Sequence, residues 1–434
     1  MKCAAVAAVL AGAIVGFAHA DDALRPAAGI PSFAPVVSIE PRNARVFTGS
    51  VLHLQARLVG LPKSATFRWT LQGPGALSPS GDVTAYQAPP SPASAIVAAA
   101  AASAGAAVNV RSVPPPRAGT PLLLVACFDR GEVDARSAVD GVRIGEAAVA
   151  QQAGSIALDT ARHLALVTAR DRVAALDLAT MQSKLSAVLS NALFSQAVEL
   201  ANGYFAVTDA NANAGQIGVR FYVIDRRGVP RLAGGVAAGE TPEGVAAERD
   251  GRAFFVSNVN GNSIMRYSFD GRGRARLIAL RKTGTRPFGM AIDERDRLLF
   301  VADNDTPMLS GARSRPGLET FQLPGLHRAR PAVSTGTPEA LPLGVAVDEP
   351  DRLLFVTNEG DATVAVYRLP DVKKIASLQS GLTPWMPAVD PLRRRLYVPS
   401  ARSDALDVFD IRKLVGSRRE LSTCSYPTGV AVDG

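Results

Sequence analysis

PFGMAIDERDRLLFVADN, residues Pro287 to Asn304, returns later in the chain as PLGVAVDEPDRLLFVTN, residues Pro342 to Asn358. Each copy has the same order: a Pro-x-Gly turn, an apolar run that ends in Asp, a charged turn, a second apolar run and a polar end. Repetition of this kind indicates stacked supersecondary units, because one unit cannot bury its apolar face without the next.

Turn prolines mark the starts of successive copies. They are Pro242, Pro287, Pro342, Pro384 and Pro427, and the gaps between them are 45, 55, 42 and 43 residues. Gaps of roughly 40–50 residues are typical of four-stranded propeller blades. The one long gap contains an insertion, Thr306 to Pro324, which we predict to be a partner-binding loop.

The copy that starts at Pro342 shows how one blade is built. Gly344 lets the chain turn tightly, and four strands are expected over residues 345–347, 353–357, 363–367 and 373–378. The third of these alternates apolar and polar residues with period two, as a half-buried antiparallel strand does.

Openings of this kind occur seven times. The apolar run of each opening ends at Asp159, Ala201, Glu248, Asp293, Asp348, Asp390 or Asp433. Six openings continue into a full copy, and the seventh stops at Gly434. We therefore predict a propeller of six to seven blades over residues 150–434, closed by N-terminal residues that complete the last blade and cover its edge.

The front of the chain has a different organisation. Residues 1–20 have the basic start, apolar run and small-x-small end of a signal peptide, and residues 21–35 form a Pro/Ala linker. We expect a periplasmic or extracellular protein with no membrane span after cleavage. Residues 36–148 are predicted to form a β-sandwich. Within it, Pro121 to Ala150 either supplies the last two sandwich strands, which we favour, or completes the seventh blade.

Charge and cysteine content limit the partners and the compartment. The formal net charge is +8, which favours an acidic partner at the cell envelope, either a protein or an acidic glycan. No basic-aromatic motif accompanies the arginines, so a nucleic acid partner is not expected. Cys127 and Cys424 remain after signal cleavage, and they form either one disulfide or two separate buried thiols.

Motifs for catalysis are scarce. The three histidines after the signal, His53, His163 and His327, have no metal-ligand spacing, and neither a Gly-x-Ser-x-Gly elbow nor a phosphate loop is present. Polar residues that follow the second strands recur from copy to copy. They are either ordinary turn residues or a ring of oxygen ligands for a polar ligand or a cation such as Ca²⁺. The candidates are Asn258, Asp303, Asn304, Asn358 and Glu359.

Two segments resemble known families. LLFVADN and LLFVTNEGDATVAVY resemble the YVTN-type repeats of secreted bacterial β-propellers, a group that merges with the lactonase-like propellers. Residues 36–145 resemble bacterial Ig-like domains through FRWTL at residues 67–71 and GDVTAYQAP at residues 81–89, which places Trp69 in a sandwich core. The resemblances imply an all-β protein, an Ig-like β-sandwich followed by a six- to seven-bladed β-propeller.

The resemblance is specific for the fold and unspecific for activity, because propellers host binding, scaffolding and hydrolysis. Our leading hypothesis is a secreted, non-catalytic scaffold that binds a protein or glycan through the propeller loops or channel mouth. The alternative is a lactonase-like hydrolase that uses a divalent cation in the central channel. For this alternative the resemblance implies that Glu243 lies at the channel with Asn258, Asn304 and Asn358.

Overall fold

The protein is described from a computed structural model, in which residues 35–42, 44–59, 66–304 and 317–434 are described. The predicted signal peptide and all but the last residue of the predicted linker lie outside these ranges. The described chain is built from strands and two short 3-10 turns, η1 (Ala201–Gly203) and η2 (Ala401–Ser403). Within the described ranges, no helix has the length and apolar character needed to span a bilayer.

Six consecutive four-stranded antiparallel sheets follow the order of the chain, and we number them as blades 1 to 6. Blade 1 is β12 (Ile156–Asp159), β13 (Leu164–Thr168), β14 (Val173–Asp177) and β15 (Gln182–Leu185); blade 2 is β16 (Phe194–Leu200), β17 (Tyr204–Asp209), β18 (Ile217–Ile224) and β19 (Pro230–Ala237); blade 3 is β20 (Pro242–Ala247), β21 (Ala253–Asn258), β22 (Ser263–Phe269) and β23 (Ala275–Lys282). Blade 4 is β24 (Pro287–Asp293), β25 (Leu298–Asp303), β26 (Gly317–Gln322) and β27 (His327–Val333); blade 5 is β28 (Pro342–Asp348), β29 (Leu353–Asn358), β30 (Thr363–Arg368) and β31 (Lys373–Gln379); blade 6 is β32 (Ala388–Asp390), β33 (Arg395–Ser400), β34 (Ala405–Asp410) and β35 (Arg419–Ser422).

The seventh blade combines the two ends of the described chain. Its strands, from the inside out, are β36 (Pro427–Asp433), β9 (Leu122–Cys127), β10 (Glu132–Ser137) and β11 (Arg143–Ala148). The favoured assignment of Pro121 to Ala150 to the sandwich is therefore wrong, and the alternative holds. All six residues of β9 are buried, because β36 covers its inner edge and neighbouring blades cover both its faces.

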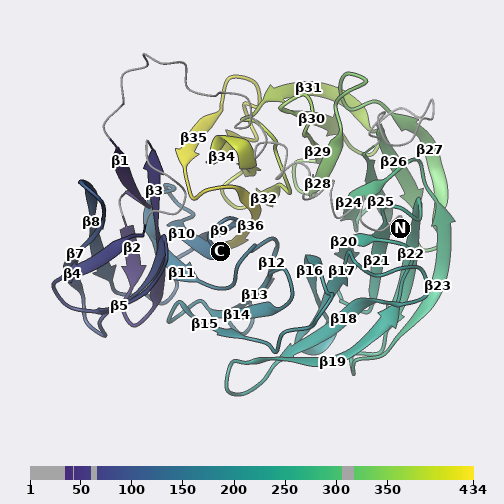
Figure 1. Cartoon of the computed structure of the whole chain (residues 1–434). Helices are drawn as coiled ribbons and strands as arrows, with labels where there is room; N and C mark the ends of the chain where they lie inside the picture. Colours follow the sequence, from purple (N-terminus) through teal and green to yellow (C-terminus); the bar gives the residue numbers. More distant parts are fainter. Residues whose placement is uncertain (1–34, 43, 60–65, 305–316) are drawn as a thin grey trace, which may run out of the picture.

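The ring is closed. Each innermost strand contacts the next, and β36 contacts β12 of blade 1 (Figure 1). Cys127 and Cys424 form a disulfide that ties blade 7 to the loop leaving blade 6. The Thr428 hydroxyl donates to the carbonyl oxygens of Ala153 and Gly154 at 3.1 and 3.0 Å, which joins β36 to blade 1. The open choice between six and seven blades resolves to seven.

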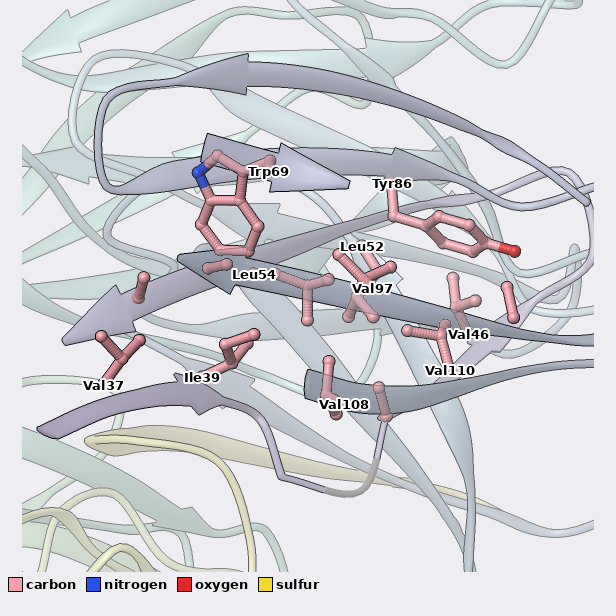
Figure 2. Close-up of a cluster of buried hydrophobic side chains, with 14 of the residues drawn as sticks. Val37, Ile39, Val46, Leu52, Leu54, Trp69, Tyr86, Val97, Val108 and Val110 are labelled. Carbon is pink, nitrogen blue, oxygen red and sulfur yellow. The ribbon is translucent and has the colours of Figure 1, made fainter. Parts of the chain in front are cut away.

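The described residues between 36 and 113 form a β-sandwich, one sheet of which continues into blade 7 where β2 (Ala44–Phe47) pairs with β11. One sheet pairs in the order β1 (Val36–Glu40), β3 (Val51–Val59), β6 (Val83–Gln87) and β5 (Ala76–Ser80); the other pairs β2, β8 (Ala104–Val113), β7 (Ala93–Ala101) and β4 (Arg68–Gln72). Apolar side chains of both sheets meet in one core, with Trp69 and Tyr86 on its upper side in Figure 2. Trp69 is buried in this core, as predicted, and its indole N–H donates to the Gly81 carbonyl oxygen at 3.1 Å. The Ig-like assignment stays a prediction from sequence.

The sandwich is attached to blades 7 and 1. Val46 of β2 pairs with Glu146 of β11, and Phe47 is fully buried among apolar residues of the propeller. Gln182 of blade 1 donates from Nε2 to the Thr48 carbonyl oxygen at 3.1 Å and to Ser50 Oγ at 2.9 Å. The sandwich thus covers the outside of blade 7, and the edges of the other blades stay open.

A hydroxyl near the end of the second strand links adjacent blades. Thr357 Oγ1 accepts the Gly344 N–H at 2.9 Å within blade 5 and donates to the Trp385 carbonyl oxygen of blade 6 at 2.9 Å. Ser257 makes the same pair of bonds between blades 3 and 4, with Gly244 and Phe288 as partners. These bonds explain why a Ser or Thr stands directly before Asn258 and Asn358, the polar residues that end the second strands.

Candidate functional site at the centre of the ring

The middle residues of the Pro-x-Gly turns come together at the ring axis. In blades 3, 4 and 5 these residues are Glu243, Phe288 and Leu343, each at a register shift that bulges the start of the inner strand. Phe288 and Leu343 pack with Trp385 and Met386 of blade 6 in one apolar cluster. Side chains from different blades can share a cluster here only because all the inner strands surround the same axis.

Glu243 is the ionisable group of this centre. Its side chain is 1% exposed, and its Oε2 accepts a hydrogen bond from Ser195 Oγ of blade 2 at 2.8 Å. Among the described residues, its Oε1 has no hydrogen-bond partner. Burial raises the pKa of Glu243 to about 7, against the opposing effects of the Ser195 hydroxyl and the Arg286 charge. Near neutral pH this carboxyl can therefore both take up and release a proton.

Gln196 connects opposite sides of the ring. Its Nε2 donates to the Met386 sulfur of blade 6 at 3.4 Å, and its Oε1 accepts the Val245 N–H of blade 3 at 3.3 Å. Sequence reasoning missed Ser195 and Gln196, because the blade 2 copy has no Pro-x-Gly turn. Alignment of the seven openings by their strand ends, rather than by proline, would have brought both residues to the axis.

A second ionisable group lies where blades 5, 6 and 7 meet. Burial raises the pKa of Glu359, and the Arg402 charge opposes this shift. Burial also raises the pKa of the Tyr426 phenol, with the charges of Glu359 and Asp129 acting in the same direction. All four residues follow second strands or precede β36, so they share the end of the ring at which Glu243 begins β20.

Asn258 and Asn358, both predicted as ligands, support turns instead. Asn258 Oδ1 accepts the Gly239 N–H at 2.8 Å, in the loop that leads into the same blade. Asn358 Nδ2 donates to the Thr335 carbonyl oxygen at 3.3 Å and to Thr363 Oγ1 at 3.0 Å. Both side chains are fully buried within their own blades. The structure thus favours the turn interpretation of these amides over a ring of ligands.

Asp303 and Asn304 separate in the same way. Asp303 is 4% exposed and lies beside Glu319 of β26; burial, then the Glu319 charge, raises the pKa of Asp303 well above its usual range. The Asn304 N–H donates to the Arg286 carbonyl oxygen at 2.9 Å, which places Asn304 next to the residues that precede β24. Of the predicted site residues, Glu243 starts an inner strand near the axis, Asn304 and Glu359 directly follow second strands at the same end of the ring, and the others lie inside blades.

Of the amides predicted to hold a cation, Asn258 does not fit that role. In residues 35–42, 44–59, 66–304 and 317–434, no three His, Cys, Asp or Glu side chains gather as metal ligands. The amide oxygen of Asn258 already accepts a backbone N–H. We therefore derive no chemical step through a cation.

The predicted partner-binding insertion, Thr306 to Pro324, is only partly described. Residues 306–316 lie outside the described ranges. Gly317–Gln322 form β26, the third strand of blade 4, so the insertion is shorter than predicted.

A polar pocket of about 630 Å³ lies on blade 2, away from the axis. Asp209 and Arg220 form an ion pair within it at 3.1 Å, and Asp209 Oδ1 also accepts the Leu193 N–H at 2.9 Å. Because these charges satisfy each other, we place the candidate chemistry at Glu243, whose carboxyl is only partly satisfied.

Comparisons with known proteins support the fold. No protein-family model and no curated protein matches the sequence. Among solved structures, a putative 6-phosphogluconolactonase from Bacteroides fragilis is similar over 73% of this chain and 99% of its own, with a TM-score of 0.59 and 12% identity. The periplasmic gluconolactonase of Pseudomonas aeruginosa is similar over 72% and 98%, with a TM-score of 0.57 and 16% identity. A protein from Lactobacillus plantarum is similar over 72% of this chain and 99% of its own, with a TM-score of 0.59 and 14% identity.

Proposed function

We propose that this chain is a lactonase-like hydrolase that opens a sugar lactone with water at the centre of the ring. The prediction of a non-catalytic scaffold is corrected, because structural neighbours named as a putative 6-phosphogluconolactonase and a periplasmic gluconolactonase favour the lactonase-like alternative. Identity to these neighbours is 12–16%, so the proposal depends on the chemistry of the centre itself.

Glu243 is the observation that carries the proposal. A carboxyl with a pKa of about 7 is matched to general base catalysis near neutral pH. In the proposed step, water attacks the lactone carbonyl carbon and passes a proton to Glu243. The ring C–O bond then breaks, and the proton moves to the departing ring oxygen. The product is the open hydroxy acid, and Glu243 returns to its carboxylate form.

Neighbouring residues would assist this step. The Ser195 hydroxyl holds one carboxylate oxygen of Glu243 in place. The Arg286 charge, which already acts on Glu243, would stabilise negative charge on the lactone oxygen. Phe288 and Leu343, 5% and 3% exposed, would limit bulk water around the reacting atoms.

The proposed location is the periplasm or the cell exterior. It is supported by the signal-like residues 1–20 and by the Cys127–Cys424 disulfide, a bond that is typical of oxidising compartments. Intact-mass measurement of the protein recovered from a periplasmic extract tests it. A mass that retains residues 1–20 would contradict cleavage.

The test of the function is hydrolysis of glucono-δ-lactone, measured against a blank without enzyme because lactones also open in water. We expect Glu243→Gln to lower kcat by about 10²–10⁴-fold, the usual range for loss of a general base. Ser195→Ala should keep activity and move the rising limb of the pH–kcat profile to higher pH, because one hydrogen bond to the carboxylate is lost. Glu420→Gln, on the exposed edge of blade 6, is the matched control.

Two results would contradict the proposal. One is wild-type protein that does not exceed the blank on glucono-δ-lactone or on its phosphorylated form. The other is a Glu243→Gln variant whose kcat equals that of Glu420→Gln.

A further inference from the structure

The positive charge of the protein is concentrated on the outer edges of three adjacent blades. We define the basic edge as residues 225–237, 270–282 and 323–333, which contain β19, β23 and β27 with the turn before each. The basic edge has ten Arg or Lys residues and two Asp residues, a balance of +8 that equals the formal net charge of the whole chain. The ten are Arg226, Arg227, Arg231, Arg272, Arg274, Arg276, Arg281, Lys282, Arg328 and Arg330.

The basic edge is continuous and exposed. β19 contacts β23, and Arg281 of blade 3 donates from Nε to the Leu326 carbonyl oxygen of blade 4 at 3.2 Å. Nine of the ten basic residues are exposed, and Arg330 is half-buried. The three strands follow one another round the perimeter of the ring (Figure 1).

Much of this charge is not neutralised within the protein. Arg231 pairs with Asp225 at 3.0 Å, and Arg328 pairs with Glu319. Among the described residues, the five basic residues of blade 3 form no ion pair, so blade 3 carries the largest uncompensated charge.

Protection of open strand edges does not explain the asymmetry. The fourth strands of blades 1 to 6 are open edges, and basic side chains there prevent pairing with other chains. The corresponding segments of blades 1, 5 and 6, residues 177–185, 371–379 and 410–422, hold seven basic and four acidic residues, a balance of +3. These three edges need the same protection as the basic edge, yet they carry less than half of its charge.

We propose that the basic edge binds a linear anionic polysaccharide. The opposite charge of such a chain complements the edge, and a flexible polymer can follow the convex perimeter across three blades. A flat anionic membrane could touch only one or two blades of a convex ring at a time. A second copy of this protein would bring like charges together, which disfavours edge-to-edge pairing. The site lies on the perimeter and does not depend on the proposed hydrolase activity.

The test is binding of polygalacturonate, a linear polymer of carboxylates, to the full chain at about 0.05 M ionic strength, with neutral dextran as the control polymer. We expect saturable binding to polygalacturonate, none to dextran, and loss of binding in 0.5 M salt as the charges are screened. Arg272→Glu/Arg274→Glu/Arg276→Glu should weaken binding by about tenfold or more, since it reverses three exposed charges on blade 3.

The matched control is Lys373→Glu/Arg412→Glu/Lys413→Glu. It makes the same change in net charge at exposed positions on blades 5 and 6. We expect it to weaken binding by less than about threefold. Equal losses in the two triple variants would show a response to net charge alone and would overturn the proposal. So would the absence of polygalacturonate binding, or binding to phosphatidylglycerol vesicles without binding to the polymer.

Discussion

Removal of the Cys127–Cys424 bond should lower the stability of the propeller by several kcal/mol. The two cysteines are 297 residues apart in the sequence. In the chain-entropy description, a closed loop of this length restricts the unfolded chain by about 6 kcal/mol at 25 °C, and native disulfides are typically worth about 2–5 kcal/mol. At roughly 2 °C per kcal/mol for a protein of this size, we expect the unfolding midpoint to fall by about 4–12 °C.

Thermal unfolding of the wild type, with and without a reductant, measures this loss while all side chains stay in place. The double variant Cys127→Ala/Cys424→Ala is the second arm, and it should match the reduced wild type closely. A midpoint that changes by less than about 1 °C on verified reduction would refute the reasoning, because it would mean that the pairing of β36 with β9 already restrains the ends.

Four further predictions follow from the structure. Thr357→Ala should destabilise the protein by about 1–3 kcal/mol in a urea titration, because it leaves the Gly344 N–H and the Trp385 carbonyl oxygen without a partner. Thr357→Ser keeps the hydroxyl and should restore most of the lost stability. In the folded protein the pKa of Glu243 is raised to about 7, so the contribution of Glu243 to the free energy of unfolding falls by about 3 kcal/mol as pH rises from about 4.5 to above 7. The stability of Glu243→Gln relative to wild type should therefore rise by that amount over this pH window. A constant difference in stability would contradict the assignment. Removal of residues 427–434 should expose the inner edge of β9 and shift the protein toward aggregates in size-exclusion chromatography, whereas a monomer with an unchanged midpoint would contradict the closed ring. Calcium and a chelator should both leave the unfolding midpoint unchanged, because Asn258 and Asn358 are engaged in turns; a chelator-sensitive midpoint would contradict this account of the two residues.

The repeats made the propeller predictable because the deciding contacts are local. Three expected strands of the Pro342 copy agree to within a residue with β29 (Leu353–Asn358), β30 and β31, whereas the first, expected at 345–347, is the longer β28 (Pro342–Asp348). The residues predicted to end the apolar runs, such as Asp348 and Asp433, lie within one residue of the ends of all seven inner strands. Antiparallel strands joined by short turns leave little freedom in register, so a local pattern is enough.

The seventh blade was harder to predict because its partners are far apart. An all-apolar run such as LLLVAC at Leu122–Cys127 fits any strand that is buried on both faces, in a sandwich or in a blade. Only the pairing with Pro427–Asp433 decides between them, and nothing near Leu122 in the sequence encodes that pairing. The same limit affected the candidate site, where Glu243 meets Ser195 across two blades.

The composition of blade 7 has a consequence for how the protein is made. β9 leaves the ribosome about 300 residues before β36, which corresponds to about 15–60 s at common rates of synthesis. During that interval β9 has no inner neighbour, and its row of unpaired backbone groups can attract other chains. Delivery of this chain to its compartment in an unfolded state, held by chaperones until both strands are present, would remove that hazard. Expression hosts that slow synthesis should therefore lower the soluble yield of this protein more than that of a propeller whose every blade is continuous in sequence.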